Sequence, residues 1–204
     1  MKAEFFETFK LLNGQLCNVA FHLGRVEKTQ AAFFDRAGFD INEVYNALKD
    51  YPEGLFKVRV DYASTILQIR AELYEIQPHR KLGLLDAGDF DYSFKFACRD
   101  FFRDSYGHHP DCDDIIFLKD GCITDTTYCN IALFDGQTWV TPHTYLLPGT
   151  KRAALLQAGI LKETRVTLHN IADFEAIAFI NALRDFEKKY TFVRDENQLI
   201  LAEL

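Results

Sequence analysis

Short runs of alternating apolar and polar residues, each ending in an Asn-Gly or Asp-Gly pair, limit the fold of this chain more than any other feature. Asn13-Gly14 follows the run at residues 4–12, and Asp120-Gly121 and Asp135-Gly136 follow runs in the second half. Such pairs tolerate the positive φ angles of tight hairpin turns, so each predicts two antiparallel strands. With helical segments between the strands, the pattern predicts a mixed α/β (α+β) protein.

The other elements are assigned from the two periodicities, 2.0 for strands and 3.6 for helices. The periodicity lapses at residues 78–93, which we take as the crossover between two subdomains, residues 1–85 and 86–204. Helices are predicted at residues 23–38, 41–51, 95–107 and from Thr150, and strands at 4–12, 15–22, 54–64, 65–76, 114–121, 122–128, 130–136, 137–142, 165–168 and 175–183.

Composition restricts the partners and the compartment. The chain has 204 residues, 48% of them hydrophobic, which is enough for a sizeable core, and its net charge is −7 without a cluster of Lys or Arg. We therefore expect neither nucleic acid nor an anionic membrane as a partner. The first residues lack the apolar region of a signal peptide, and five cysteines without a C-x-x-C pair indicate reduced thiols, so a cytoplasmic protein is expected.

The stretch "PGTKRAALL" at residues 148–156 places a turn directly before a helix. The first N–H groups of a helix have no partner within it, and the helix dipole makes this end positive, so it is suited to bind an anion such as phosphate. The alternative is an ordinary turn in which Thr150 caps the helix.

Each of three charged residues can be interpreted in two ways, as a chemically active group or as a purely structural one. Lys95 stands between Phe94 and Phe96, where burial would favour a neutral, nucleophilic amine, or where its stem simply covers apolar surface. Asp125 is either a residue at the edge of a turn or a carboxylate that holds a proton on a heteroaromatic nitrogen. Arg25 is either an exposed helix residue or a phosphate ligand.

In their order along the chain, these residues resemble the class IV (fold-type IV) pyridoxal-phosphate enzymes, which include branched-chain and D-amino-acid aminotransferases and aminodeoxychorismate lyase. The resemblance runs from "FFETFKLLNGQLCNVAFHLGRVEKT" to "ADFEAIAFINALR" and is most specific in "DTTYCNIALFDGQTWVTPHTYLLPGTKR". It implies a two-subdomain architecture like that of D-amino-acid aminotransferase, with a barrel-like second subdomain. It also implies pyridoxal 5′-phosphate as the cofactor, a homodimer, and no metal.

The resemblance also implies a role for each matching residue. Lys95 corresponds to the catalytic lysine that forms a Schiff base with the cofactor, and Asp125 to the residue that pairs with the pyridine nitrogen. The cofactor-binding residues implied are Arg25, Lys95, Asp125, Thr127, Asn130, Gly149, Thr150 and Lys151, with Arg25 and the turn at 149–151 on the phosphate, and the substrate-binding residues implied are Thr8, Arg99 and Asn181.

Two features depart from the family pattern. The family has Glu where this chain has Asp125, so the side chain is one methylene shorter. Family members usually carry some twenty residues ahead of the "FET" motif, which here occupies residues 6–8, so we expect a short form that lacks part of the usual substrate contacts.

Within the family, "KFACR" and "INALR" resemble aminodeoxychorismate lyase through Arg99 and Asn181. We therefore expect a lyase that converts 4-amino-4-deoxychorismate to 4-aminobenzoate and pyruvate. The alternatives are an aminotransferase for D- or branched-chain amino acids and a non-catalytic relic of the fold.

Two other kinds of site are weighed and set aside. His108, His109 and Cys112 could belong to a metal site, but no second half supplies matching ligands. The turn at residues 148–152 lacks the spacing of a nucleotide-binding P-loop.

Overall fold

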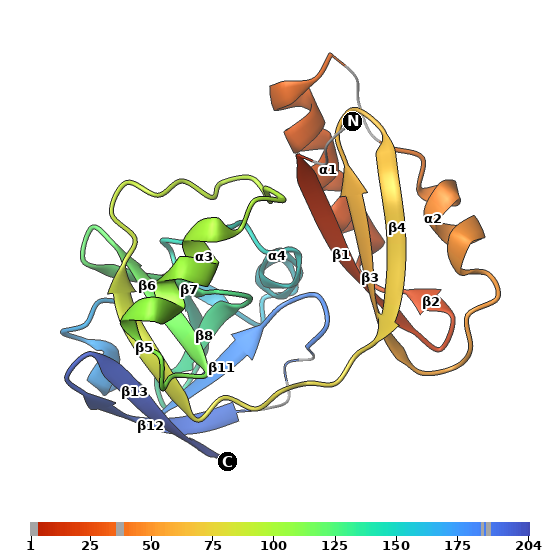
Figure 1. Ribbon diagram of the computed structural model, residues 1–204. Helices are drawn as coiled ribbons and strands as arrows, with labels where there is room; N and C mark the ends of the chain where they lie inside the picture. The colour runs from red at the N-terminus through yellow and green to blue at the C-terminus, as the bar shows by residue number, and fades with distance from the viewer. Residues whose placement is uncertain (1–3, 36–38, 185, 187–188) are drawn as a thin grey trace. The chain divides into compact units, whose positions relative to one another are not determined.

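The computed structural model (Figure 1) describes residues 4–35, 39–184, 186 and 189–204. The chain divides into two compact units, one formed by Met1–Ile76 with Phe94–Cys98 and the other by Gln77–Ser93 with Arg99–Leu204. Lys95 therefore belongs to the first unit, whereas a boundary between residues 85 and 86 would assign it to the second.

The first unit is a four-stranded antiparallel sheet with the strand order β2-β1-β3-β4 and two helices. Its hairpin turn has φ angles of 48° at Asn13 and 77° at Gly14, which confirms the turn predicted from this pair. The elements are β1 (Phe5–Leu12), β2 (Gln15–Leu16), α1 (Val19–Phe33), α2 (Ile41–Leu48), β3 (Leu55–Tyr62) and β4 (Ile66–Leu73).

The strand predicted at residues 15–22 is wrong beyond its first two residues. Only Gln15 and Leu16 pair with β1, and α1 already begins at Val19. Buried His22 and Val26 then lie on one face of this helix, four residues apart. The helix ends at Phe33, and the stop predicted at Gly38 lies outside the described residues.

One face of the sheet carries the core of the first unit. Phe5 and Phe9 of β1 and Val58 of β3 pack with Val26 of α1 and Val44 of α2. Successive strand residues point to opposite faces, so Phe6, Thr8 and Lys10 of β1 lie on the other face. Both helices thus cover the same face of the sheet (Figure 1).

The helix predicted from residue 95 is wrong at its start. Residues 94–97 are extended alongside β1: the Phe6 N–H donates to the Lys95 carbonyl (3.1 Å), and the Ala97 N–H donates to the Glu4 carbonyl (2.9 Å). The rings of Phe96 and Phe5 pack with their centroids 5.1 Å apart. These non-local contacts override the local helical spacing, and α3 is only Asp100–Ser105.

The second unit contains a closed barrel. Pairing runs β8-β11-β12-β13-β5-β6-β7, and β7 pairs again with β8 at Asp125 and Asn130, which closes a ring of seven strands. β9 and β10 continue the sheet outward from β8. The elements are β5 (Lys81–Asp86), α3, η1 (Tyr106–His108), β6 (Asp114–Lys119), β7 (Cys122–Thr126), β8 (Asn130–Phe134), β9 (Trp139–Pro142), α4 (Thr150–Gln157), β10 (Lys162–Thr164), η2 (Ile171–Asp173), β11 (Ala176–Ile180), β12 (Lys189–Asp195) and β13 (Gln198–Glu203).

This barrel confirms the expected fold class, a mixed α/β protein with a barrel-like second subdomain, but it contains three unpredicted strands. β5 lies inside the stretch taken as a crossover, and β12 and β13 form an antiparallel pair near the C-terminus. The strand predicted at residues 165–168 is found instead at Lys162–Thr164, in parallel with β9.

One end of the barrel brings together segments that are far apart in sequence. β7 ends at Thr126 and β8 begins at Asn130, and Ile180 at the end of β11 pairs with that same Asn130. β9 is antiparallel to β8, so its end at Pro142 points toward this end as well. In the described part of the chain, none of the helices combines the length and apolar character needed to cross a membrane.

Candidate functional site

In the first unit, three side chains from β1 and α1 form a buried ionic cluster. Glu7 Oε2 lies 2.7 Å from His22 Nδ1, and the same carboxylate accepts hydrogen bonds from Arg25 Nε (2.8 Å) and Nη2 (2.7 Å). Glu7 and His22 are fully buried, and only a tenth of the Arg25 side chain is exposed. The carboxylate therefore fixes the plane of the guanidinium group.

The cluster sets the protonation of its members. Burial would raise the pKa of Glu7, but the charge of Arg25 and the hydrogen bonds from Arg25 and His22 outweigh it and hold that pKa far below its usual range. Burial lowers the pKa of His22, and the charges of Arg25 and Lys95 lower it further despite Glu7. The cluster is thus an ionised Glu–Arg pair beside a neutral imidazole.

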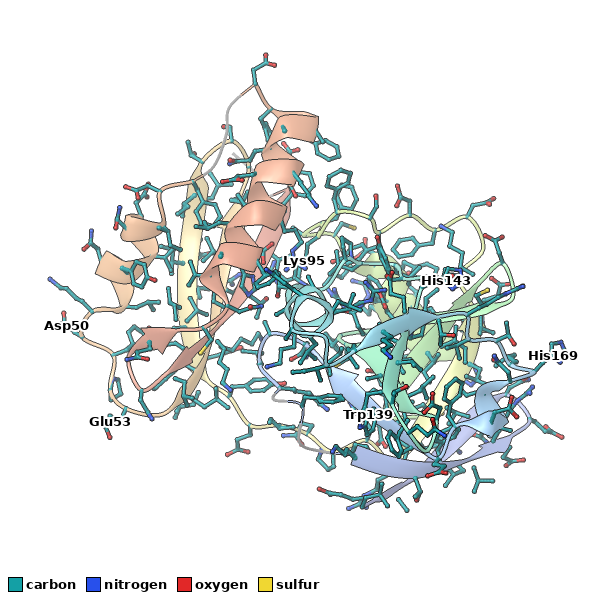
Figure 2. All side chains as sticks on the ribbon, turned by 180° about the vertical axis from the view of Figure 1, so that it is seen from behind. Asp50, Glu53, Lys95, Trp139, His143 and His169 are labelled. Atoms are coloured by element: carbon teal, nitrogen blue, oxygen red, sulfur yellow. The ribbon has the colours of Figure 1, made fainter. Side chains whose placement is uncertain are left out.

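Lys95 lies on the polar side of the first unit. Its Nζ is 4.6 Å from the centroid of the Phe6 ring, and the side chain is labelled in Figure 2. Thr8, two residues after Phe6 on β1, lies on the same face and is directly opposite Arg59 of β3. Among the residues predicted for the site, Arg25, Lys95 and Thr8 thus belong to this unit, and the others belong to the second.

In the second unit, Asp125 joins three segments at the end of the barrel. Its Oδ1 accepts a hydrogen bond from Asn130 Nδ2 (2.7 Å), and its Oδ2 accepts from the N–H groups of Leu146 (2.9 Å) and Leu147 (2.8 Å). The residue is only 4% exposed. A carboxylate has about four lone-pair positions, and these three hydrogen bonds leave one on Oδ1 for a further donor.

Burial raises the pKa of Asp125 to about 6, although the hydrogen bonds from Leu147, Asn130 and Leu146 and the charge of Arg152 work in the opposite direction. At neutral pH the group is therefore mostly a carboxylate. It is an ionised acceptor in a water-poor environment, which is what a protonated heteroaromatic nitrogen requires as a partner.

The position of the Asn130 side chain explains why residue 149 is a glycine. A Cβ atom added to Gly149 would lie 1.7 Å from Asn130 Oδ1, so any side chain at position 149 would displace the amide that holds Asp125. Asn130 Nδ2 also donates to the Leu147 carbonyl (3.0 Å). Gly149 is the N-cap of α4, and Thr150 and Lys151 form its first turn, so the predicted helix start is confirmed as a structural element.

Arg99, Thr127 and Asn181 meet at the three-residue turn between β7 and β8. Arg99 Nη2 donates to the Thr127 carbonyl (2.6 Å) and Nη1 to the Tyr92 hydroxyl (3.1 Å). Asn181 Nδ2 donates to the Tyr128 carbonyl (3.3 Å) on the same turn. The hydrogen bonds to the Thr127 and Tyr128 carbonyls hold the turn that follows β7, and the bond to Tyr92 orients the guanidinium of Arg99.

The side chain of Asn181 also organises its own segment. Its Oδ1 accepts from the N–H groups of Leu183 (2.9 Å) and Arg184 (3.0 Å). Both ends of this amide are therefore engaged within the protein. The geometry gives Arg99 and Asn181 a positioning role, and direct contact of either with a substrate stays a prediction.

The residues of the set-aside metal site do not gather into one. His109 Nε2 lies 3.1 Å from the Leu84 carbonyl, and Cys112 Sγ lies 4.0 Å from Gln198 Oε1. Within the described ranges, no group of three or more His, Cys, Asp or Glu side chains has the spacing to hold a metal ion.

The sequence analysis did not assign roles to Glu7 or His22. His22 precedes Arg25 by three positions, which places both on one side of a helix, but their carboxylate partner is 15 positions away from His22 on β1. Glu7 lies two positions from Phe5 and two from Phe9 on β1, so its burial on the helix-covered face that they share follows from the period of two.

Comparisons with known proteins agree with these observations. The family model for amino-transferase class IV matches residues 108–186. An uncharacterized protein of Haemophilus influenzae is 29% identical over 181 residues, which are 87% of this chain and 96% of that protein.

Two solved structures show the similarity in three dimensions. A putative 4-amino-4-deoxychorismate lyase from Haemophilus somnus has a TM-score of 0.80 and 27% identity, and the match covers 90% of this chain and 97% of the other. A hypothetical aminotransferase from Mycobacterium tuberculosis in its PLP-bound form has a TM-score of 0.70 and 15% identity, covering 89% and 78%. At 15% identity the likeness concerns the fold alone.

The match to the family model covers the barrel strands β6, β7, β8 and β11, the flanking strand β9 and the helix α4, and thus includes Asp125, Asn130 and Gly149. The structure from Haemophilus somnus extends the similarity to nine-tenths of the chain. In both sequence and fold, this protein resembles the class IV aminotransferases, the fold-type IV family.

Proposed function

We propose that the protein is a pyridoxal 5′-phosphate-dependent lyase that converts 4-amino-4-deoxychorismate to 4-aminobenzoate and pyruvate. The cofactor is supported by the chemistry of the donors and acceptors. Asp125 is a buried, ionised acceptor with one lone-pair position left, and the start of α4 presents backbone N–H groups next to Gly149. Lys95 supplies a primary amine on an aromatic surface.

In this proposal, each residue has the role that the family resemblance implies. Arg25 and the N-terminal turn of α4 bind its phosphate, Asp125 accepts a hydrogen bond from its pyridine nitrogen, and Lys95 anchors it covalently. When bound, pyridoxal phosphate supplies an electron-accepting ring that stabilises negative charge on the carbon next to the substrate nitrogen.

The residues of this chain provide the remaining steps. Lys95 Nζ, once released from the cofactor, acts as the general base that removes a proton from the substrate carbon bearing the amine. Asp125 must stay ionised for the ring nitrogen to stay protonated. The hydrogen bonds from Asn130, Leu146 and Leu147 hold its carboxylate in place before the substrate arrives.

The observation that carries the choice of a lyase is the convergence of Arg99 and Asn181 on the β7–β8 turn. These are the two residues whose motifs resemble the lyase, and they hold the turn that follows Asp125. The solved structure with 27% identity is also named for this reaction. The runner-up is an aminotransferase for D- or branched-chain amino acids, which the name of the matching family model favours.

The cofactor is tested first and without turnover. The protein is loaded with pyridoxal phosphate, reduced with borohydride, digested and mapped by mass spectrometry. We expect the pyridoxyl group on Lys95, and its loss together with the visible absorption band in Lys95→Ala. Lys28→Ala, which removes an exposed lysine of α1, is the matched control and should keep both. A band that survives in Lys95→Ala would refute the assignment.

The reaction is tested in two parallel incubations. One contains aminodeoxychorismate, and the other contains D- and L-amino acids with 2-oxoglutarate. The proposal predicts 4-aminobenzoate and pyruvate in the first and little amino transfer in the second. Amino transfer without 4-aminobenzoate would establish the aminotransferase instead, and inactivity in both with a loaded Lys95 would support a non-catalytic protein.

The proposal includes a cytoplasmic homodimer as the working assembly. Sedimentation equilibrium of the loaded protein measures the mass directly. We expect twice the chain mass of 23.5 kDa, and a monomer under conditions that support turnover would remove the dimer from the proposal.

A further inference from the structure

Three buried polar side chains of the second unit have atoms without a hydrogen-bond partner in the described part of the chain. These atoms are both ring nitrogens of His79, Oδ2 of Asp114 and Nε of Arg184. The exposed fractions of the three residues are 7%, 1% and 7%. Buried polar groups in folded proteins nearly always have a partner, so each of these atoms requires an explanation.

Hydrogen bonds hold the segments of these residues side by side. Arg184 Nη2 donates to the Gln77 carbonyl (2.8 Å). Three positions after Gln77, the N–H of Arg80 donates to Asp113 Oδ2 (2.7 Å). His79 lies between these two contacts along the chain, and its segment therefore borders both Arg184 and the start of β6.

Electrostatic effects on His79 agree with this arrangement. Burial and the charge of Arg184 lower the pKa of His79, and the charges of Asp114 and Asp113 oppose this shift only in part. The imidazole is therefore neutral at neutral pH, with one N–H donor and one acceptor nitrogen. The ring packs against that of Phe179, with the two ring centroids 4.6 Å apart.

The four unpartnered atoms are balanced in charge and in hydrogen-bonding type. Asp114 Oδ2 accepts, Arg184 Nε donates, and the neutral ring of His79 does one of each. An anion would be repelled by Asp114, and a cation by Arg184. Water is a small neutral molecule that both donates and accepts, and buried waters typically bind several otherwise unpartnered polar groups at once.

Two of the three residues also support the turn between β7 and β8. Asp114 Oδ1 accepts a hydrogen bond from the Thr127 N–H (3.2 Å). The Arg184 N–H donates to Oδ1 of Asn181 (3.0 Å), whose side-chain nitrogen holds the same turn. A bridge from Asp114 through His79 to Arg184 would thus join the two supports of one turn.

We propose that water molecules bound inside the second unit bridge Asp114 Oδ2, the ring of His79 and Arg184 Nε. This internal hydration site has His79 as its central residue. Through Asp114, it stabilises the turn that contains Thr127. The inference goes beyond the proposed function, because the site needs neither cofactor nor substrate.

A crystal structure of the wild-type protein, at a resolution that shows ordered water, tests the site directly. We expect a water molecule at hydrogen-bonding distance, about 2.5–3.2 Å, from a ring nitrogen of His79. The same molecule, or a second one bonded to it, should reach Asp114 Oδ2 or Arg184 Nε.

Unfolding in urea gives a second test, in which the sign of the effect decides. If the His79 nitrogens had no partner at all, His79→Leu would remove a desolvation cost and stabilise the protein. If they bind water, the substitution breaks the bridge and destabilises the protein. We expect the equilibrium constant for unfolding to rise about five- to 150-fold, the range for buried polar groups that lose a partner.

Two control variants separate hydration from packing. His79→Gln keeps a donor and an acceptor, so its unfolding constant should lie closer to that of the wild type than the constant of His79→Leu does. His169→Leu makes the same change at an exposed histidine, which is labelled in Figure 2. It should alter the constant by less than about threefold, as is usual for surface substitutions.

Amide exchange tests the link to the turn. Exchange of the Thr127 N–H with deuterium should be faster in His79→Leu than in the wild type. The Ala153 N–H, which donates to the Gly149 carbonyl (2.9 Å) in α4, is the reference amide. Exchange at Thr127 should accelerate more than at Ala153, because the lost bridge opens the turn locally.

The inference fails if the crystal structure shows direct hydrogen bonds among the three side chains, or no water beside His79. It also fails if His79→Leu is at least as stable as the wild type, or if His79→Gln is no more stable than His79→Leu. Equal acceleration at Thr127 and Ala153 would overturn the link to the turn. Each measurement uses the protein without a cofactor, so its result is separate from the test of the proposed function.

Discussion

Glu7→Gln tests the physical logic of the buried cluster in the first unit. The substitution keeps the size of the side chain and removes its charge, so the Arg25 guanidinium remains buried opposite a neutral amide. Removing one partner of a buried ion pair destabilises a protein by about 3–5 kcal/mol, because the remaining charge is left uncompensated. The full burial of Glu7 and the nearly buried Arg25 place this pair in that class.

The effect on thermal unfolding follows from the chain length. For a domain of 150–250 residues, 1 kcal/mol shifts the melting temperature by about 2–4 °C, so we expect Tm to fall by about 10 °C in calorimetry. Glu72→Gln is the matched control in the same sheet. Its ion pair with Lys57 is exposed, and such pairs contribute at most about 1 kcal/mol.

The pH dependence gives a second, independent check. The pKa of Glu7 is lower in the folded chain than in the unfolded one, so its stabilising contribution is complete above the unfolded value of about 4.3 and is lost as the pH falls below it. The wild type should therefore lose more stability than Glu7→Gln between pH 5 and pH 3. Equal acid sensitivity, or a Tm loss no larger than in Glu72→Gln, would refute the reasoning.

Four further predictions concern the second unit. The pKa of Asp125 is raised to about 6, so the free energy of unfolding should fall by roughly 3 kcal/mol as the pH rises from about 4 to 6. Urea titrations should show this pH dependence in the wild type but not in Asp125→Asn. If Asp125→Asn keeps the dependence, another group causes it. Asp125→Asn should keep bound cofactor but lose turnover, so unchanged kcat would exclude the pyridine-nitrogen role. Gly149→Ala should displace Asn130 and weaken cofactor binding in a fluorescence titration, whereas Gly107→Ala, with open space around it, should not. Arg99→Gln should lower kcat with little change in cofactor affinity, and the opposite split would place Arg99 on the cofactor.

The hairpins were predictable because their information is local. Asn13-Gly14 and Asp120-Gly121 fix the turn geometry by themselves, and the flanking alternation fixes the faces of the strands. The extended segment around Lys95 was not predictable in the same way, because its pairing with β1 joins residues about 90 positions apart. β5 was missed because it is a short, mostly buried strand in parallel with β6, and such strands lack a clear period of two.

In the candidate site, too, some features could be recognised from the sequence and others depend on the three-dimensional contacts. The residue types of Lys95, Asp125 and Gly149 and their order allowed a family resemblance, and the structure then showed why Gly149 must lack a side chain. Pairing of Glu7 with Arg25, and of Asp61 with two arginines, depends on register and on the placement of α1. A single sequence without its three-dimensional contacts contains no signal for these partners.

The carboxylate of Asp125 connects the end of β7, the start of β8 and the loop at Leu146 and Leu147. Whatever changes its charge must therefore act on all three segments at once. A bound cation beside Asp125 would strengthen these hydrogen bonds, and by thermodynamic linkage the same segments would open less often in the loaded protein. The amide protons of Leu146 and Leu147 are thus natural reporters of cofactor occupancy, since their exchange with deuterium should slow as the cofactor binds.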